Sequence, residues 1–213
     1  MKRFTNVSLA ILLIISSMTS YAQQDASKLL EKVIAHMTSF NNIRFDFTYR
    51  MTNQRAGIDE SQAGILYLNK EAYRVEMNDQ QIICDGKTVW TYLKDSKEVM
   101  VTDASEDPDV ISPTTLLTGY HKEYLTNFAT DPAYERQGLK IIELRPSHNK
   151  NFSLVKVVIK ESESMVTALI IDDNGGNSFE YDLSKMKTNN DLASDFFRFD
   201  AKRYPDVDVI DMR

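Results

Sequence analysis

The stretch IICDGKTVWTYLKDSKEVMVTD, residues 82–103, predicts three short antiparallel strands in series. Its apolar start ends at Asp85-Gly86, a dipeptide that favours the tight turn of a β-hairpin. A run of β-branched and aromatic residues follows at Thr88–Leu93, and a polar turn separates it from a third, alternating strand. The meander carries the single Trp of the chain, Trp90, so an antiparallel sheet organises the predicted fold.

Trp90 and Tyr92 share one face of their strand, because side chains alternate along an extended chain. A Trp in such a sheet is more often part of the core than a ligand contact. Cys84, the single Cys, lies in an apolar strand and is predicted to be a small buried hydrophobic residue rather than a reactive thiol. With one Cys, the chain forms no internal disulfide.

The N-terminal segment has the pattern of a secretory leader. It begins with Lys2 and Arg3, continues through an apolar centre at 9–15, and ends with small residues around Ala22. We expect cleavage after Ala22, which divides the chain into a signal peptide at 1–22 and a single domain at 23–213. The exported chain has no Cys at the cleavage point, so it is not expected to carry a lipid anchor itself.

The overall charge is acidic, with a formal net charge of −6 at pH 7. Removal of the basic leader makes the remaining chain more acidic still. Such a surface argues against nucleic acid as a partner and against electrostatic docking to an anionic membrane. No later segment approaches the roughly 18 apolar residues that a membrane-spanning helix needs.

Hydrophobic periodicity predicts a helix followed by a long strand. Apolar residues recur at helical spacing over 25–40, whereas residues 43–51 alternate with a period of two. A polar loop at 53–62 leads to a second strand at 63–68 that is apolar on both faces, and a third strand follows at 73–77. We expect the N-terminal helix to cover the outer face of the second strand.

The pattern changes after Asp103. Ser112-Pro113 has the form of a helix start, with Ser as the cap and Pro in the first turn, and one or two short helices are predicted at 114–125. Strand patterns then resume. The remaining predicted strands are 138–144, 152–160, 165–171, 179–183 and a final strand with Phe196, Phe197 and Phe199. The elements fit one large, strongly curved antiparallel sheet with helices on one face.

The sequence shows no assembled catalytic or metal site. His36, His121 and His148 lie in separate segments, without a second metal-type ligand at helical or strand spacing. No nucleophile elbow, phosphate-binding loop or dinucleotide motif occurs. We therefore expect no metal, no cofactor and no enzymatic activity.

Aromatic side chains on the sheet are abundant instead. They are Phe45, Phe47, Tyr49, Tyr73, Trp90, Tyr92, Phe179, Tyr181 and Phe197. If the sheet curves around them, they enclose either a solid core or an apolar cavity, and the sequence leaves both open.

Three segments are informative when they are taken together: the strand GILYL at 64–68, the turn and strand DGKTVWTY at 85–92, and the closing FRF at 197–199 followed by YPDVDVI at 204–210. They resemble the periplasmic outer-membrane lipoprotein carrier family, LolA-like proteins. The DGKTVWTY element is the specific part, and the remaining agreement follows the order of elements along the exported chain. The helix comes first and the Ser112-Pro113 segment lies where the family has its lid.

The resemblance implies a mainly β (α+β) fold of about ten to eleven strands, an incomplete barrel whose hydrophobic cavity is covered by an N-terminal helix and a short helical lid. Such proteins bind the acyl chains of lipoproteins without a cofactor. They receive the cargo from an inner-membrane release complex and pass it towards an outer-membrane acceptor, and a monomer is expected. By position, the cavity and lid residues would be Phe45, Phe47, Tyr49, Tyr73, Val75, Trp90, Tyr92, Leu116 and Leu117.

One position departs from the family pattern. The family has a basic residue followed by Pro at the end of the second strand, and this side chain holds the lid closed. This chain reads Asn69-Lys70-Glu71, and Lys lacks the planar fork of donors that Arg offers. Lys70 is therefore a weaker candidate for the lid latch.

Two other functions remain open at this point. The same fold can act as a lipid- or envelope-stress-sensing interaction module that binds a membrane partner, although sensors of this type usually carry an additional domain. An envelope enzyme is the least favoured reading, because no nucleophile–base pair is visible.

Overall fold

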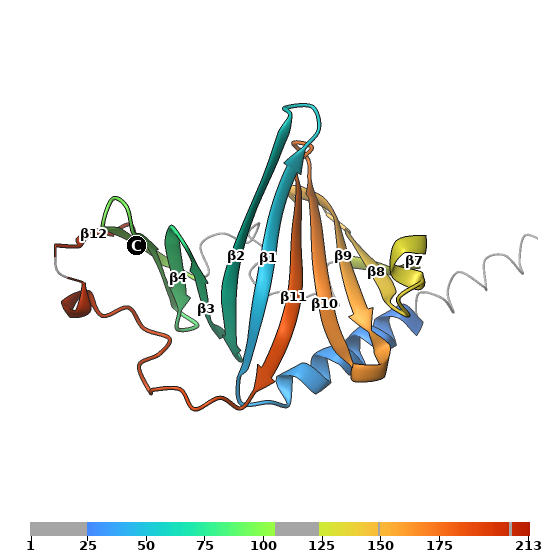
Figure 1. Cartoon of the computed structure of the whole chain (residues 1–213), viewed down its shortest axis with the longest axis horizontal. Helices are drawn as coiled ribbons and strands as arrows, with labels where there is room; N and C mark the ends of the chain where they lie inside the picture. The colour runs from blue at the N-terminus through green and yellow to red at the C-terminus, as the bar shows by residue number, and fades with distance from the viewer. Residues whose placement is uncertain (1–24, 105–123, 149, 205) are drawn as a thin grey trace, which may run out of the picture.

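The alternating residues found in the sequence form one sheet in the computed structural model, which describes residues 25–104, 124–148, 150–204 and 206–213. Within these residues the sheet has twelve strands in the order β12-β6-β5-β4-β3-β2-β1-β11-β10-β9-β8-β7 (Figure 1). The strands are β1 (Ile43–Asn53), β2 (Ile58–Asn69), β3 (Ala72–Met77), β4 (Gln80–Cys84), β5 (Thr88–Leu93), β6 (Glu98–Asp103), β7 (Tyr124–Ala129), β8 (Lys140–Pro146), β9 (Phe152–Lys160), β10 (Met165–Asp173), β11 (Ser178–Thr188) and β12 (Asp208–Asp211).

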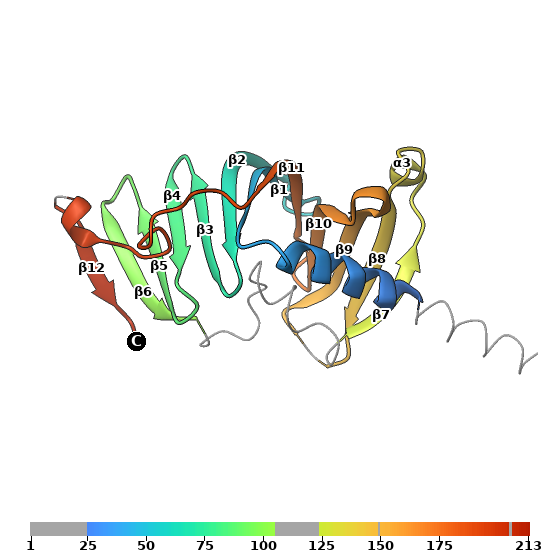
Figure 2. The ribbon, with the colours of Figure 1, turned by 90° about the horizontal axis from the view of Figure 1, so that it is seen from below.

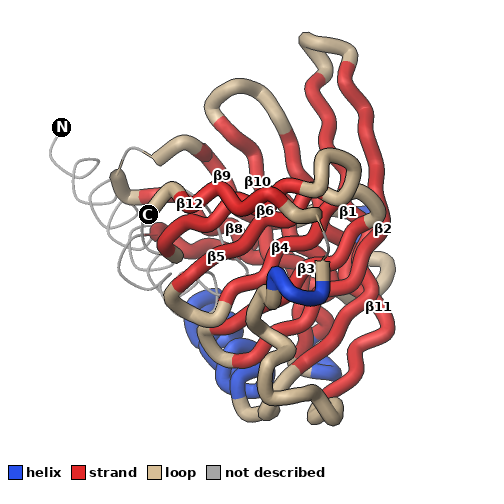
Figure 3. The backbone as a smooth tube through the Cα atoms, turned by 90° about the vertical axis from the view of Figure 1, so that its left-hand side faces the viewer, coloured by secondary structure: helices blue, strands red, loops and turns tan. Residues whose placement is uncertain are grey.

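The sheet is strongly curved and open (Figure 3). All neighbouring strands pair antiparallel except β12, which pairs parallel with β6. β12 and β7 form the two edges and do not pair with each other. The predicted incomplete barrel of antiparallel strands is confirmed, with β7 and β12 as strands that the periodicity did not reveal.

Helical segments in the described residues are few. The N-terminal helix covers residues 25–38. The others are single turns, α3 (Pro132–Glu135), η2 (Glu161–Glu163) and η3 (Ala201–Arg203). The predicted leader at 1–22 and the predicted lid from Ser112 to Gly119 lie outside the described residues. Tyr124 and Leu125, predicted at the end of the short helices at 114–125, belong to the edge strand β7.

The N-terminal helix covers the inner, concave face of the sheet (Figure 2). Leu30, Val33 and Met37 are almost fully buried, in one core with Phe45 and Ile142 of the sheet. The predicted apolar stripe of this helix is confirmed, but the expectation that it covers the outer face of the second strand is wrong.

The outer face of β2 is covered by the C-terminal strap, residues 189–204. The ring of Phe196 meets that of Tyr67 edge-on, with centroids 4.8 Å apart. At the start of the strap, the Asn42 Nδ2 donates to the Asn190 carbonyl at 2.9 Å, and the Asn190 backbone N–H donates to Asn42 Oδ1 at 2.9 Å. The strap then crosses β3 to β5 towards η3 (Figure 2).

The strap corrects the predicted final strand. Phe196 and Phe197 lie in turns, because backbone hydrogen bonds from Phe196 to Ala193 and from Arg198 to Asp195 close tight loops there, and Phe199 follows in irregular chain. The rings of neighbouring Phe196 and Phe197 stand at 83° to each other. These Phe residues therefore belong to a segment that covers the outer face of the sheet, and they do not form a strand of that sheet.

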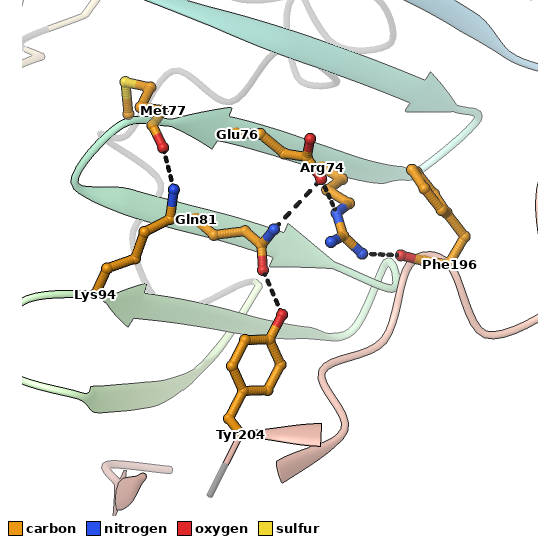
Figure 4. A network of polar contacts seen from close by, with 7 residues as sticks. All are labelled: Arg74, Glu76, Met77, Gln81, Lys94, Phe196 and Tyr204. Carbon is orange, nitrogen blue, oxygen red and sulfur yellow. Dashed lines mark hydrogen bonds and ion pairs between the residues drawn. The ribbon is translucent and has the colours of Figure 1, made fainter. Parts of the chain in front are cut away.

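A chain of polar contacts holds the strap against β3 and β4 (Figure 4). The Arg74 Nε donates to Glu76 Oε1 at 2.7 Å and its Nη1 donates to the Phe196 carbonyl at 3.0 Å. The Gln81 Nε2 also donates to Glu76 Oε1, at 3.3 Å, and Gln81 Oε1 accepts from the Tyr204 hydroxyl at 3.1 Å. The guanidinium of Arg74 lies over the Phe196 ring, 4.7 Å from its centroid.

The loop predicted at 53–62 is shorter in the structure. β2 begins at Ile58, and only residues 54–57 form the turn. The Arg50 guanidinium pairs with Asp59 across the hairpin at 2.7 Å. Residues 59–62 are exposed, because this end of the hairpin extends beyond the core, so the strand carries no hydrophobic alternation by which it could be recognised.

Candidate functional site

A cavity of about 420 Å³ lies between the N-terminal helix and the concave face of the sheet. The helix contributes Leu30, Ile34 and Met37, which share one helical face through their spacing of four and three residues. Strands β1 to β4 and β8 to β11 supply the other walls. The volume lies within the roughly 300–1,000 Å³ typical of small-molecule sites.

Strand β1 supplies the central wall. Phe45, Phe47 and Tyr49 alternate with polar residues and all line the cavity. Phe45 is fully buried and Phe47 is 5% exposed. Phe47 pairs in register with Gly64 of β2, and its ring lies over the space that a Cβ at Gly64 would fill. The glycine in β2 thus gives the Phe47 ring its place in the wall.

Strand β3 has two functions on its two faces. Tyr73, Val75 and Met77 line the cavity, whereas Arg74 and Glu76 point to the outer face and hold the C-terminal strap. A single strand therefore separates the cavity from the strap. Because successive side chains of a strand point to opposite faces, one face of β3 lines the cavity and the other contacts the strap.

The structure brings five of the predicted site residues together. Phe45, Phe47, Tyr49, Tyr73 and Val75 all line the cavity.

Trp90 and Tyr92 do not belong to this wall, which corrects their predicted place. Ile82 lines the cavity and pairs with Thr91, so the neighbours of Thr91 along β5 point to the outer face. There the Tyr92 ring packs against Phe199 and Tyr204 of the strap, with centroids 5.7 and 4.8 Å away. Alternation correctly grouped Trp90 with Tyr92, but it does not tell which face is the inside.

The predicted lid contacts are not described. Leu116 and Leu117 lie outside the described residues. Lys70, the candidate latch, is exposed in the turn between β2 and β3 with a φ of 51°, and it does not line the cavity. Its role as a latch stays a prediction.

The sequence-based prediction also missed a large part of the wall. The helix residues Leu30, Ile34 and Met37 line the cavity, as do Leu169 of β10 and Leu183 of β11. The signal for the helix was present in its apolar stripe. For β10 and β11, their pairing with β9 and β1 places them at the cavity, and this long-range order is not visible in the local pattern.

The cavity is apolar, with polar atoms at a few points. Among the described residues, its lining includes no charged side chain; Gln62 and Gln80 are its amides. Burial raises the pKa of Tyr73 to about 12, and also that of Tyr181 to about 12. Both phenols therefore stay neutral across the physiological range, so the site offers hydrogen-bond donors but no charge.

Metal chemistry receives no support from the described residues, where no group of three or more His, Cys, Asp or Glu side chains is placed to hold an ion. Burial raises the pKa of the Cys84 thiol. No helix in the described part of the chain is long and apolar enough to cross a membrane. The aromatic and aliphatic lining of the cavity suits an apolar ligand.

The family model for outer membrane lipoprotein carrier protein LolA matches residues 38–200. The chain belongs to the LolA family. This match spans the strands that line the cavity in the LolA-family chain and most of the strap, and it begins after the helix residues Leu30, Ile34 and Met37.

Similar proteins agree with this assignment. An outer-membrane lipoprotein carrier protein of Coxiella burnetii is 27% identical over 197 residues, covering 87% of this chain and 88% of the relative. One from Shewanella baltica is 26% identical over 212 residues, covering 97% and 95%. An uncharacterised conserved protein of Thermus thermophilus has a similar solved structure, with a TM-score of 0.56 and 14% identity over 88% of this chain and 99% of that one. The last likeness shows that the LolA-family fold is shared.

Proposed function

We propose that this protein is a periplasmic carrier that encloses the acyl chains of lipoproteins and transports them from the inner membrane towards the outer membrane. The observation that carries the proposal is the cavity, built from an apolar helix face and the concave face of an open sheet. The relatives from Coxiella burnetii and Shewanella baltica are named as outer-membrane lipoprotein carriers. Family and geometry support the same role.

The energetics of acyl chains agree with an enclosed site. A chain of ~16 carbons gains roughly 13 kcal/mol on leaving water, at about 0.8 kcal/mol per buried CH₂. A carrier must offer comparable apolar enclosure, since a flat surface leaves much of the chain wet. In this proposal the cavity binds the acyl chain without making or breaking a covalent bond, so the protein would act as a carrier and not as an enzyme.

The proposal extends to processing and partners. The leader at 1–22 would be removed on export, and residues 23–213 would act as one monomeric domain. Its partners would be acylated lipoproteins, an inner-membrane release complex and an outer-membrane acceptor. The acidic net charge supports a chain that does not bind anionic membranes or nucleic acid directly.

Native mass spectrometry of the protein, purified from its own periplasm without detergent, tests this function. We expect a protein that begins at Gln23 and carries acylated protein at one-to-one stoichiometry. Displacement of a fluorescent fatty acid then locates the site. Leu169→Trp places a larger side chain inside the cavity and should abolish dye binding. Leu125→Trp, at an exposed position of β7, should leave dye binding intact. A protein that is empty as isolated and also fails to bind the dye would refute a carrier role.

A further inference from the structure

One row of side chains across the cavity wall differs from the rows beside it. In β1, Tyr49 pairs in register with Gln62 of β2 on one side and with Tyr181 of β11 on the other. All three line the cavity. The neighbouring row on the same face consists of Phe47 between Gly64 and Leu183. The wall therefore changes from purely apolar to hydroxyl-bearing within one step along the strands.

The two hydroxyls of this row have no hydrogen-bond partner in the part of the chain that the structure describes. The rings of Tyr49 and Tyr181 lie side by side, with centroids 5.1 Å apart. Neither hydroxyl forms a hydrogen bond with another described residue, and neither oxygen is among the sealed, unpartnered atoms of the described chain. Both tyrosines are half-buried, so their O–H groups are not sealed in the core and remain open to a molecule that enters the cavity. A Tyr hydroxyl joins an apolar ring to a polar donor, so this pair can bind a polar atom at the end of an apolar ligand.

Tyr73 provides an internal contrast. It lines the same cavity, but it lies on β3, in register with Cys84 of β4 and outside the row of Tyr49 and Tyr181. Its hydroxyl therefore serves as a reference for the pair.

We propose that Tyr49 and Tyr181 form a carbonyl-binding pair that selects acyl chains attached through an ester or amide group. This inference rests on the proposed carrier function. The cavity would take the hydrocarbon, and the two phenol O–H groups would donate to the carbonyl oxygens where the chain joins its head group. Two donors on neighbouring strands suit two acyl groups held side by side, as in a diacylglyceryl unit.

Burial supports the assignment. Desolvation raises the pKa of both phenols, so they remain protonated and can donate at any physiological pH. A neutral donor suits a carbonyl oxygen, which carries partial charge only. A free carboxylate would instead be expected to meet a cationic side chain, and the described lining has none.

The test compares matched ester and ether lipids. A monoacylglycerol and the corresponding 1-O-alkylglycerol, with equal carbon number, differ in the carbonyl group. Competition against a fluorescent fatty acid gives the two affinities. The wild-type protein should prefer the ester by about 2- to 10-fold, the net effect of one hydrogen bond. The double variant Tyr49→Phe/Tyr181→Phe should bind both lipids equally, with its affinity for the ether unchanged.

Tyr73→Phe is the matched control, because it removes a hydroxyl from the same cavity and should keep the ester preference. Equal wild-type affinity for ester and ether would overturn the carbonyl-binding pair while leaving the carrier function intact. Failure of both lipids to bind would instead refute the carrier function on which the inference rests. A diacylglyceryl-cysteine peptide and free diacylglycerol should both show the preference over their dialkyl ethers, and tighter binding of the peptide would identify lipoprotein as the source of the ester groups.

Discussion

Replacement of Gly64 by Ala tests whether the cavity wall is built around this glycine. A Cβ at Gly64 would lie 2.5 Å from Cζ and 2.7 Å from Cε1 of Phe47, and 2.6 Å from the Glu76 carbonyl oxygen. These separations are about 1 Å inside the optimum of roughly 3.5–4.0 Å between carbon atoms. The ring can rotate away, but the Glu76 carbonyl belongs to the neighbouring strand and moves only with the sheet.

The direction of the change in the free energy of unfolding tests this close contact. In an ordinary strand, Gly→Ala is expected to stabilise by about 0.5–1 kcal/mol. Overpacking of a well-filled site costs about 1–3 kcal/mol. For Gly64→Ala we therefore expect a net loss of about 1–2 kcal/mol, which lowers Tm by roughly 2–8 °C for a domain of this size.

Calorimetry or circular dichroism gives the melting temperature, and the fluorescent fatty acid assay gives the second readout. Because the displaced Phe47 ring moves into the cavity, ligand affinity should fall together with Tm. Phe47→Leu in the Gly64→Ala background should recover part of the lost stability, with a coupling energy of about 0.5–3 kcal/mol. A Gly64→Ala protein that melts at or above the wild-type temperature would show that the close approach of Phe47 does not exist in solution.

Three further predictions concern the core, the tyrosines and the strap. Phe45→Ala should lower the free energy of unfolding by about 3–5 kcal/mol in urea titration, because Phe45 is fully buried; a loss below 1 kcal/mol would contradict its place in the core. The pKa values of Tyr73 and Tyr181 are raised to about 12, above the ordinary value, so their contribution to stability is complete below about pH 10 and is lost as the pH rises towards 12. Thermal melts should fall over that range, and less steeply in each Tyr→Phe variant. Arg74→Met should remove the hydrogen bond to the Phe196 carbonyl, leave Glu76 with Gln81 alone and increase hydrogen exchange at residues 193–204; unchanged exchange in the strap would exclude Arg74 as its anchor. Arg50→Met, which removes an exposed ion pair, should change stability by less than about 1 kcal/mol.

Local periodicity predicted most of the sheet. Residues 43–51 show a clean period of two because one face of β1 meets the core and the other meets polar surroundings. The same rule failed at residues 59–62, where consecutive residues are exposed and no core contact forces hydrophobic alternation. It failed in the opposite way at Phe196 to Phe199, where aromatic residues cover a sheet from outside.

The site was predictable in part for the same physical reason. A strand pattern tells which side chains share a face, so Tyr73 was correctly grouped with Val75, and Trp90 with Tyr92. Which face becomes the inside depends on pairing between distant strands and on what covers the outer face. For β5 the covering segment is more than a hundred residues away in the chain, at Phe199 and Tyr204. No local signal carries that information.

The open edges of the sheet have a consequence for the range of ligands. In a closed barrel, strand number and shear fix the radius, and widening it breaks backbone hydrogen bonds. Here β7 and β12 do not meet, so every ladder can stay intact while the arc between them opens or tightens. The width of the cavity is then set by side-chain contacts. Rearranging these contacts costs far less free energy than breaking the backbone hydrogen bonds that close a barrel. If the proposed carrier function holds, a cavity of adjustable width would let one protein accept acyl chains of different length and number.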